Sequence, residues 1–200
     1  NIPELSRNGN LYLAPQDAFT EENWVYNDMI EDLGFELPAF GDSYTVDEWV
    51  AIGKAAKAKG LDGLMFGPVE SWCVLDGFAN FVNQQNDAYP TDVLGQAYDG
   101  EISWDQPMFR DALNAYKTMH DNGVWRADSL SMDYQVQAWG KWLDREGVGI
   151  YCNGDWFISS APADYNTADS LGITMMSYPK LSSDSPMVYN LSLIHISEPT

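Results

Sequence analysis

Residues 147–159 read GVGIYCNGDWFIS and join a buried strand to a polar turn. Residues 148–152 are an apolar run between glycines, which is typical of a core strand. The Asn153-Gly154 pair then turns the chain and presents Asp155 and Trp156. In α/β proteins, ligands bind in the crevice outside the carboxyl ends of the strands. The stretch therefore predicts a core strand that ends at a binding site.

The composition indicates a globular chain and excludes polyanionic partners. Of the 200 residues, 45% are hydrophobic and 14% are aromatic, which is enough for a packed core. The formal net charge is −20, from 10 Lys and Arg against 30 Asp and Glu. Nucleic acids and anionic membranes attract clustered Lys and Arg, so we expect neither as a partner. The acidic side chains are interpreted as a solvated face.

Strand-like and helix-like segments alternate along the chain. A helix is predicted from Thr45, which has Glu48 three residues later as in a capping box, to Gly60. A second helix is predicted after Asp105, which we expect to cap it. A further helix is expected at 70–84. Strands are expected at 8–15, 62–68, 147–154 and 172–179. This alternation predicts an α/β fold with a largely parallel sheet.

Several residues with reactive or aromatic side chains are interpreted as structural. Cys73 and Cys152 match neither a zinc spacing nor a CxxC motif, so we expect two small buried side chains, with a disulfide between them as the alternative. We expect no metal and no cofactor. Trp49 belongs to the apolar stripe of its helix, and Trp139 and Trp142 are predicted to form one buried helix face.

The order of the segments resembles family 1 extracellular solute-binding proteins of sugar ABC importers, of which the maltodextrin-binding proteins are the best known. The likeness covers residues 8–190. It is carried by seven segments in the same order: NGNLYLAP, WVYNDMIEDLGFELP, TVDEWVAIGKAAKAKG, LMFGPVESW, FRDALNAYKTMHDNGVW, YCNGDWF and GITMMSYPK. The resemblance implies one lobe of a two-lobed periplasmic-binding-protein-like fold, with a mixed, mostly parallel sheet flanked by helices.

Residue by residue, the resemblance implies a sugar site. The family's NGxW segment places Trp156 where a sugar-stacking aromatic lies, with Asp155 beside it. Glu70 and Trp72 match an acidic and an aromatic residue that follow the LMF strand. After the first crossing the match is looser, so Asp17, Phe19 and Thr20 remain alternatives for the residue that faces the ligand. An aromatic ring suits the apolar face of a pyranose, and ionised carboxylates accept hydrogen bonds from its hydroxyls.

The implied function is extracytoplasmic binding of a sugar or oligosaccharide for delivery to the membrane permease subunits of an ABC importer. The protein is then a monomer and not an enzyme, located in the periplasm or at the cell surface as a lipoprotein. The sequence given has no signal segment and begins without an initiator Met. One alternative is a glycoside hydrolase that uses Glu70 and Asp155 as its carboxylate pair. The other is a non-catalytic protein-interaction lobe.

The ends of the chain are expected to be incomplete. Residues 1–15 are predicted to contain the end of a first lobe and the first hinge crossing, and residues 16–190 the second lobe. The last ten residues, LSLIHISEPT, correspond to a translated transposase adapter of sequencing libraries, so residues 191–200 are expected to be an artefact. Leu191 and Ser192 could also be native.

Overall fold

The computed structural model describes residues 6–8, 10–11, 15–39, 41–61, 63, 70–85, 93–146, 149–154, 156, 171–188 and 190–195. No helix within these ranges is both long enough and apolar enough to cross a membrane. The described helices are α1 (Asn27–Asp32), α2 (Val46–Ala58), α3 (Ser71–Asn83), α4 (Val93–Tyr98), α5 (Pro107–Asp121) and α6 (Trp139–Leu143).

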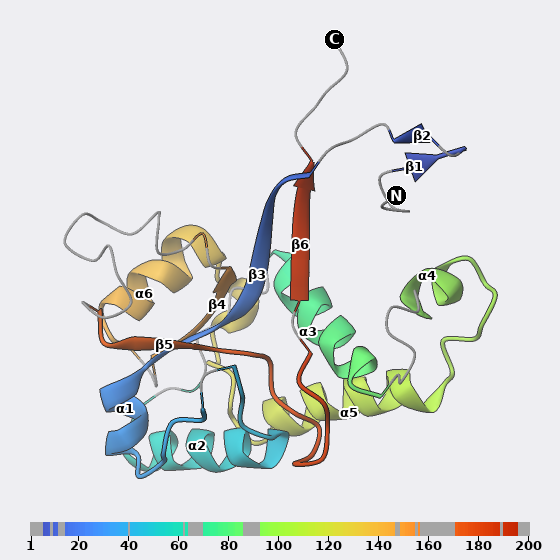
Figure 1. The fold of residues 1–200 in the computed structure, drawn as a ribbon. Coiled ribbons are helices and arrows are strands. Elements are labelled where there is room, and N and C mark those ends of the chain that lie inside the picture. Colours follow the sequence, from blue (N-terminus) through green and yellow to red (C-terminus); the bar gives the residue numbers. More distant parts are fainter. Residues whose placement is uncertain are drawn as a thin grey trace.

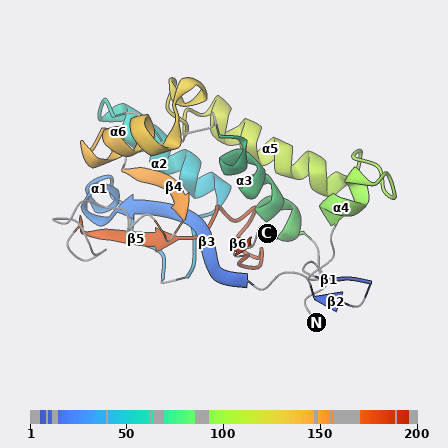
Figure 2. The same cartoon turned by 90° about the horizontal axis from the view of Figure 1, so that it is seen from above.

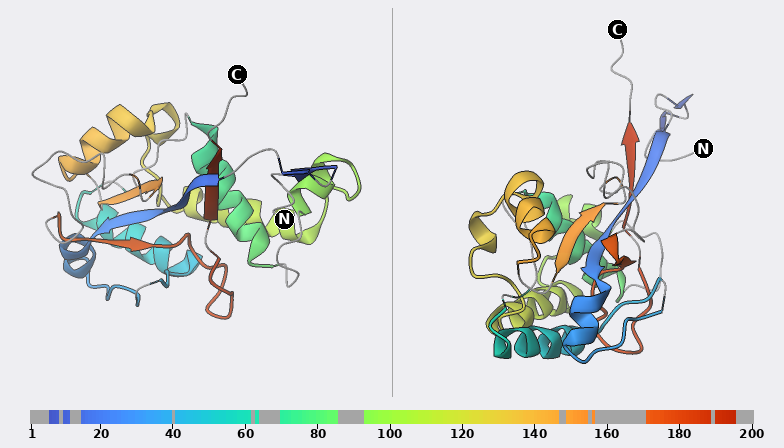
Figure 3. Two further views of the ribbon diagram at one scale, coloured as in Figure 1. Left: turned by 45° about the horizontal axis from the view of Figure 1, so that its top comes forward. Right: turned by 90° about the vertical axis from the view of Figure 1, so that its left-hand side faces the viewer.

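The main sheet is built on one long strand, β3 (Pro15–Tyr26), shown in blue in Figure 1. Its second half pairs with β4 (Ile150–Gly154) on one edge and β5 (Ile173–Met176) on the other. Its first half pairs with β6 (Asn190–His195), and the two strands leave the body of the molecule together (Figure 3). Two short strands, β1 (Ser6–Arg7) and β2 (Asn10–Leu11), form a separate antiparallel pair.

The direction of pairing differs from the expected parallel sheet. β4 and β5 point the same way, as strands that alternate with helices should. However, β3 lies between them and runs in the opposite direction, so every pair of named strands is antiparallel. Of the strand predicted at 62–68, only residue 63 lies within the described residues. Pro15, the last residue of the strand predicted at 8–15, instead begins β3, a position that tolerates the missing N–H of proline.

The helix predictions are confirmed with one correction. Glu48 N–H donates to Thr45 Oγ1 at 3.2 Å, and Thr45 N–H donates to Glu48 Oε2 at 2.7 Å, which is the capping box expected at the start of α2. The cap position of α5 is Gln106 rather than Asp105. The Asp105 carboxylate accepts a hydrogen bond from Arg110 Nε at 2.7 Å instead.

The alternation of side chains along β3 creates two cores. Val25 faces the larger core, which it shares with buried side chains of α2, α3 and α5. Trp24 and Tyr26 face the smaller core with α6, where Tyr26 stacks on Trp142 with ring centroids 4.3 Å apart. Trp142 is fully buried as predicted, while Trp139 is half-buried at the edge of the same core.

A glycine brings α3 close to the rest of the larger core. A Cβ atom on Gly77 would lie 2.2 Å from Tyr116 Oη and 2.9 Å from a ring carbon of Tyr178. Tyr116, on α5, donates its hydroxyl hydrogen to the carbonyl oxygen of Val74 at 2.8 Å. α3 and α5 therefore lie side by side (Figure 2), which holds the amino end of α3 near the end of β4.

Trp49 offers a test of the larger core, because its side chain is only 1% exposed. We expect Trp49→Ala to lower the free energy of unfolding by roughly 3 to 5 kcal/mol, from lost apolar contacts and the cavity left behind. Chemical denaturation followed by circular dichroism measures this. Trp104→Ala is the matched control, because Trp104 is 52% exposed and should cost much less. Equal losses in the two variants would contradict the position of Trp49 in the core.

Candidate ligand-binding site

Two tryptophans that are distant in the sequence lie next to each other at one edge of the sheet. Trp72 is in the first turn of α3, and Trp156 follows the end of β4. Their ring centroids are 6.1 Å apart and their planes are inclined by 58°. Both side chains are half-buried, so each ring keeps accessible surface. The pair forms an angled aromatic wall at the carboxyl end of β4.

Gly154 allows Trp156 to fold back over the strand end. A Cβ atom at Gly154 would lie 1.9 Å from Trp156 Cζ3, so any larger residue would displace the ring. The backbone N–H of Gly154 donates to Asn153 Oδ1 at 2.8 Å, and Asn153 is buried. The Asn-Gly pair of the sequence motif thus shapes the turn that positions the indole.

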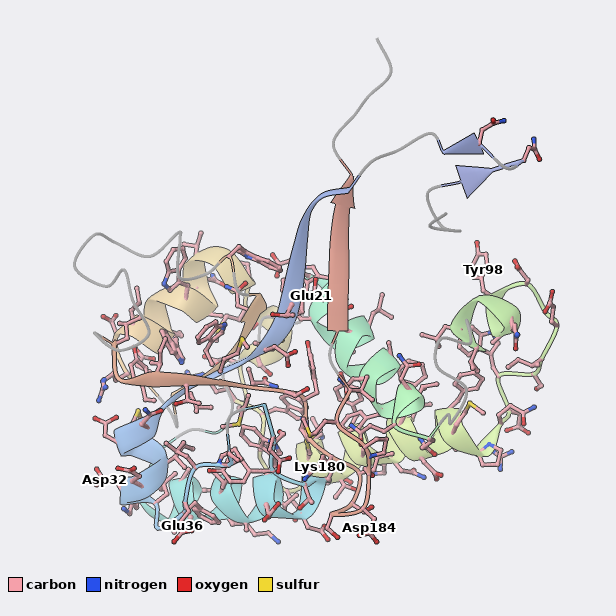
Figure 4. The ribbon with its side chains drawn as sticks, viewed as in Figure 1. Glu21, Asp32, Glu36, Tyr98, Lys180 and Asp184 are labelled. Carbon is pink, nitrogen blue, oxygen red and sulfur yellow. The ribbon has the colours of Figure 1, made fainter. Side chains whose placement is uncertain are left out.

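Two carboxyl groups that the sequence analysis did not select lie beside the aromatic pair. Glu21 is the residue of β3 that pairs with Gly154, and Figure 4 shows it where β3 passes α3. Its carboxyl group is hydrogen-bonded to Asp76, which lies one helical turn after Trp72 on α3. Burial, followed by this hydrogen bond and the charges of Asp76 and Glu22, raises the pKa of Glu21 to about 8. Glu21 therefore keeps its proton at pH 7.

Glu22 occupies the opposite face of β3 and is completely buried. Burial raises its pKa to about 8, so this side chain is also neutral at pH 7. A neutral carboxyl group avoids most of the cost of placing a charge in the protein interior. Adjacent acidic residues in one strand thus have different surroundings, one in the candidate site and one inside the molecule.

The structure brings together two of the six predicted site residues, because the rings of Trp72 and Trp156 are in contact. Glu70 is the N-cap residue of α3, two positions before Trp72. Asp155 lies outside the described residues. Asp17 and Phe19 are placed in β3 opposite Ile194 and Ser192, but their side chains lie outside the described part.

Asp76 and Glu21 were missed for different reasons. Asp76 follows Trp72 by four residues, a helical spacing that places two side chains on one face, so the sequence did contain a signal. Glu21 reaches the site only through the pairing of β3 with β4, which no local pattern reveals.

Both cysteines are buried and carry free thiols, which confirms the expectation of two small buried side chains over the alternative of a disulfide. Cys152 Sγ lies 3.1 Å from the hydroxyl oxygen of Tyr178. The neighbouring Cys152 thiol and burial raise the pKa of Cys73 well above its usual value. Within the described ranges, no group of three or more His, Cys, Asp or Glu residues could hold a metal ion.

The comparisons with known proteins identify the fold. No protein-family model and no curated protein matches the sequence. Among solved structures, a chitin oligosaccharide binding protein superimposes with a TM-score of 0.76 at 18% identity, over 98% of this chain and 46% of that chain. A family 1 extracellular solute-binding protein from Bifidobacterium longum subsp. infantis gives 0.70 at 14% identity, over 96% and 46%. A sugar transporter from Bacillus licheniformis in complex with stachyose gives 0.65 at 12% identity, over 96% and 48%.

The chain has the fold of a solute-binding-protein lobe. The likeness extends over nearly all of this chain but spans only about half the length of the structures that it matches. The expected α/β lobe is confirmed in its class, with the antiparallel pairing of β3 as its correction. The predicted domain boundaries at residues 15 and 190 remain predictions. β6 extends through 191–195, so half of the segment interpreted as an artefact pairs with β3.

The buried carboxyl group of Glu22 predicts a pH-dependent stability. Its pKa is about 8 in the folded chain against a usual 4.5, so between these values the folded state holds a proton that the unfolded chain has lost. The free energy of unfolding should therefore fall as the pH rises from about 4.5 to about 8, with Glu22 contributing on the order of 4 kcal/mol.

Urea denaturation at a series of pH values measures this slope. Glu22→Gln cannot ionise and should make the slope shallower, while Glu21, whose pKa is also about 8, keeps part of it. Glu101→Gln is the control, because Glu101 is exposed and its replacement should leave the slope unchanged. A Glu22→Gln variant with the unaltered slope would show that Glu22 ionises freely in the folded chain.

Proposed function

We propose that the chain is the ligand-binding lobe of an extracytoplasmic protein that captures a sugar or oligosaccharide for an ABC importer. The observation that carries the proposal is the contact between the rings of Trp72 and Trp156 at the end of β4, with ring centroids 6.1 Å apart. A pyranose has an apolar face of C–H groups and a rim of hydroxyls. Two inclined indoles offer a surface for such faces, and carboxyl oxygens accept hydrogen bonds from the rim.

The carboxyl groups of the proposed site supply its hydrogen bonds to the ligand. Glu70 precedes α3 beside Trp72 and would act as an acceptor for ligand hydroxyls. Glu21 and Asp76 share one hydrogen bond, in which the protonated carboxyl group donates to the other, so their remaining lone pairs can accept hydrogen bonds from ligand hydroxyls. Asp155, Asp17 and Phe19 are proposed as further contacts.

The structural relatives support a sugar as the ligand class. One is a chitin oligosaccharide binding protein, and another is a sugar transporter in complex with stachyose. These relatives are binding proteins rather than enzymes, which favours binding without turnover. The permease subunits of an importer as partners, a monomeric state and an extracytoplasmic location are parts of the same proposal.

A glycoside hydrolase remains the competing function, with Glu70 and Asp155 as its carboxylate pair. Prolonged incubation with oligosaccharides separates the two. Saturable binding without release of reducing sugar supports the proposal, while a steady release of reducing ends would overturn it in favour of the hydrolase.

Trp72 and Trp156 should carry binding energy in a two-lobed form of the protein, made by fusing the chain to the other half of a solved relative. We expect Trp72→Ala and Trp156→Ala each to weaken sugar binding by about 1 to 3 kcal/mol, the scale for losing an aromatic anchor. Isothermal titration calorimetry measures the change. Trp104→Ala is the control, because Trp104 packs against Phe109 away from the site. Unchanged affinity in both site variants would remove the aromatic pair from the proposed site.

The 200-residue chain alone should bind its sugar weakly. Ligand pockets bury about 70 to 90% of the ligand surface, and a single lobe covers only one side. Immobilising the ligand costs the lobe nearly the same entropy with fewer contacts. Losing half the contacts therefore removes more than half of the net free energy of binding. We expect a dissociation constant no tighter than about 1 mM by calorimetry. Micromolar binding by the chain alone would contradict closure between two lobes.

A further inference from the structure

A second hollow lies away from the aromatic pair, on the other side of α3. Its volume is about 780 Å³, within the range of about 300 to 1,000 Å³ that ligand pockets occupy. It opens between the last turn of α2, the outer face of α3 and the last turns of α5. Val74 and Phe78 line it from α3. Val74 follows Trp72 by two residues, and side chains two positions apart on an α-helix point in nearly opposite directions.

The floor of this cavity is apolar and held in place. Trp125 stacks on Tyr116 with ring centroids 5.8 Å apart and planes inclined by 19°. The Tyr116 hydroxyl donates to the carbonyl oxygen of Val74 at 2.8 Å, so its polar end is already bonded to the protein. Phe78 stacks on Phe109 from the neighbouring helix, with centroids 6.2 Å apart. The floor therefore presents hydrocarbon surface supported by the larger core.

Two large apolar side chains stand at the mouth. Leu75 on α3 and Leu113 on α5 both line the cavity, and each is 59% exposed. Exposed leucines on facing helices, above an apolar floor, form a continuous hydrophobic surface that a ligand would remove from water.

The ionisable side chains that line the cavity are basic, and most of them are paired with acidic neighbours. Lys57, Lys117, His120 and Arg126 line it, while no Asp or Glu is among its described lining residues. Arg126 pairs with Asp128 at 2.8 Å and with Glu146 at 3.8 Å, and Asp121 pairs with both Lys117 and His120. Lys57 has no ion pair among the described residues, so its charge is available to a ligand.

We propose that this cavity binds an amphiphile with an unbranched hydrocarbon chain and a carboxylate group. The hydrocarbon chain lies on Val74, Phe78 and Trp125 between the two leucines. The carboxylate faces Lys57, at the end of α2, with Lys117 beyond it on α5. Apolar burial supplies most of the affinity, and the charge of Lys57 selects an anionic head group over a neutral or cationic one. This site is separate from the proposed sugar site and does not depend on it.

Calorimetry of the 200-residue chain with decanoate tests the proposal, with decan-1-ol as the neutral ligand of equal chain length. We expect decanoate to bind with one-to-one stoichiometry and a micromolar dissociation constant, about tenfold more tightly than decan-1-ol. Lys57→Gln should remove this difference by weakening decanoate alone. Lys54→Gln is its control, because Lys54 is exposed on the same helix and does not line the cavity.

A charge at the mouth provides a second, independent test. Leu113→Glu should weaken decanoate binding at least about tenfold, because it places a carboxylate against the ligand's apolar chain. Val136→Glu is the matched control, since Val136 is 74% exposed and lies outside the cavity. Both positions are exposed, so neither change removes a core contact.

Three results would overturn the proposal. The first is decanoate binding weaker than millimolar, and the second is equal binding by Leu113→Glu and Val136→Glu. The third is a concentration-dependent dimer in analytical ultracentrifugation that Leu113→Glu dissociates while decanoate fails to bind, because the face would then be covered by a second copy of the chain.

Discussion

The backbone hydrogen bonds of β3 join it to β4 and β5 along its second half and to β6 along its first half. Because successive side chains of a strand point to opposite faces, this one strand divides the interior in two. Val25 belongs to the core under α2, α3 and α5, and Trp24 belongs to the core under α6. A shift of its register by one residue would exchange the two sets and place Glu21 where Glu22 now lies.

The same alternation explains why a central strand contains two adjacent acidic residues. Glu21 is carried to the edge of the sheet beside Asp76, while Glu22 is enclosed on the other face, and both have a pKa of about 8. Buried carboxyl groups lower the stability of a fold at neutral pH, since each must hold a proton or bear an uncompensated charge. At Glu21 the proton forms the hydrogen bond to Asp76, which holds two carboxyl groups together in the proposed sugar site. The structure shows no comparable use for Glu22.

Helix α3 separates two surfaces with different chemistry. One side carries Trp72 and Asp76, where aromatic rings and carboxyl groups suit a neutral ligand rich in hydroxyls. The other side carries Val74 and Phe78, where hydrocarbon and the nearby Lys57 suit an anionic amphiphile. Gly77 permits the close packing that holds the helix between them. Both surfaces therefore depend on the same contact between α3 and the tyrosines of the larger core.

The sequence by itself determined the features that depend on neighbouring residues. The capping box follows from the spacing of Thr45 and Glu48, and the burial of Trp49 follows from helical periodicity, while the resemblance implied Trp72 and Trp156 as site residues. The tertiary structure alone decided the antiparallel direction of the sheet, the partnership of Glu21 with Asp76 and the apolar cavity behind α3. Each of these joins segments far apart in the chain. Their meeting depends on the register of β3 and on the packing of α3, and neither leaves a periodic pattern in the sequence.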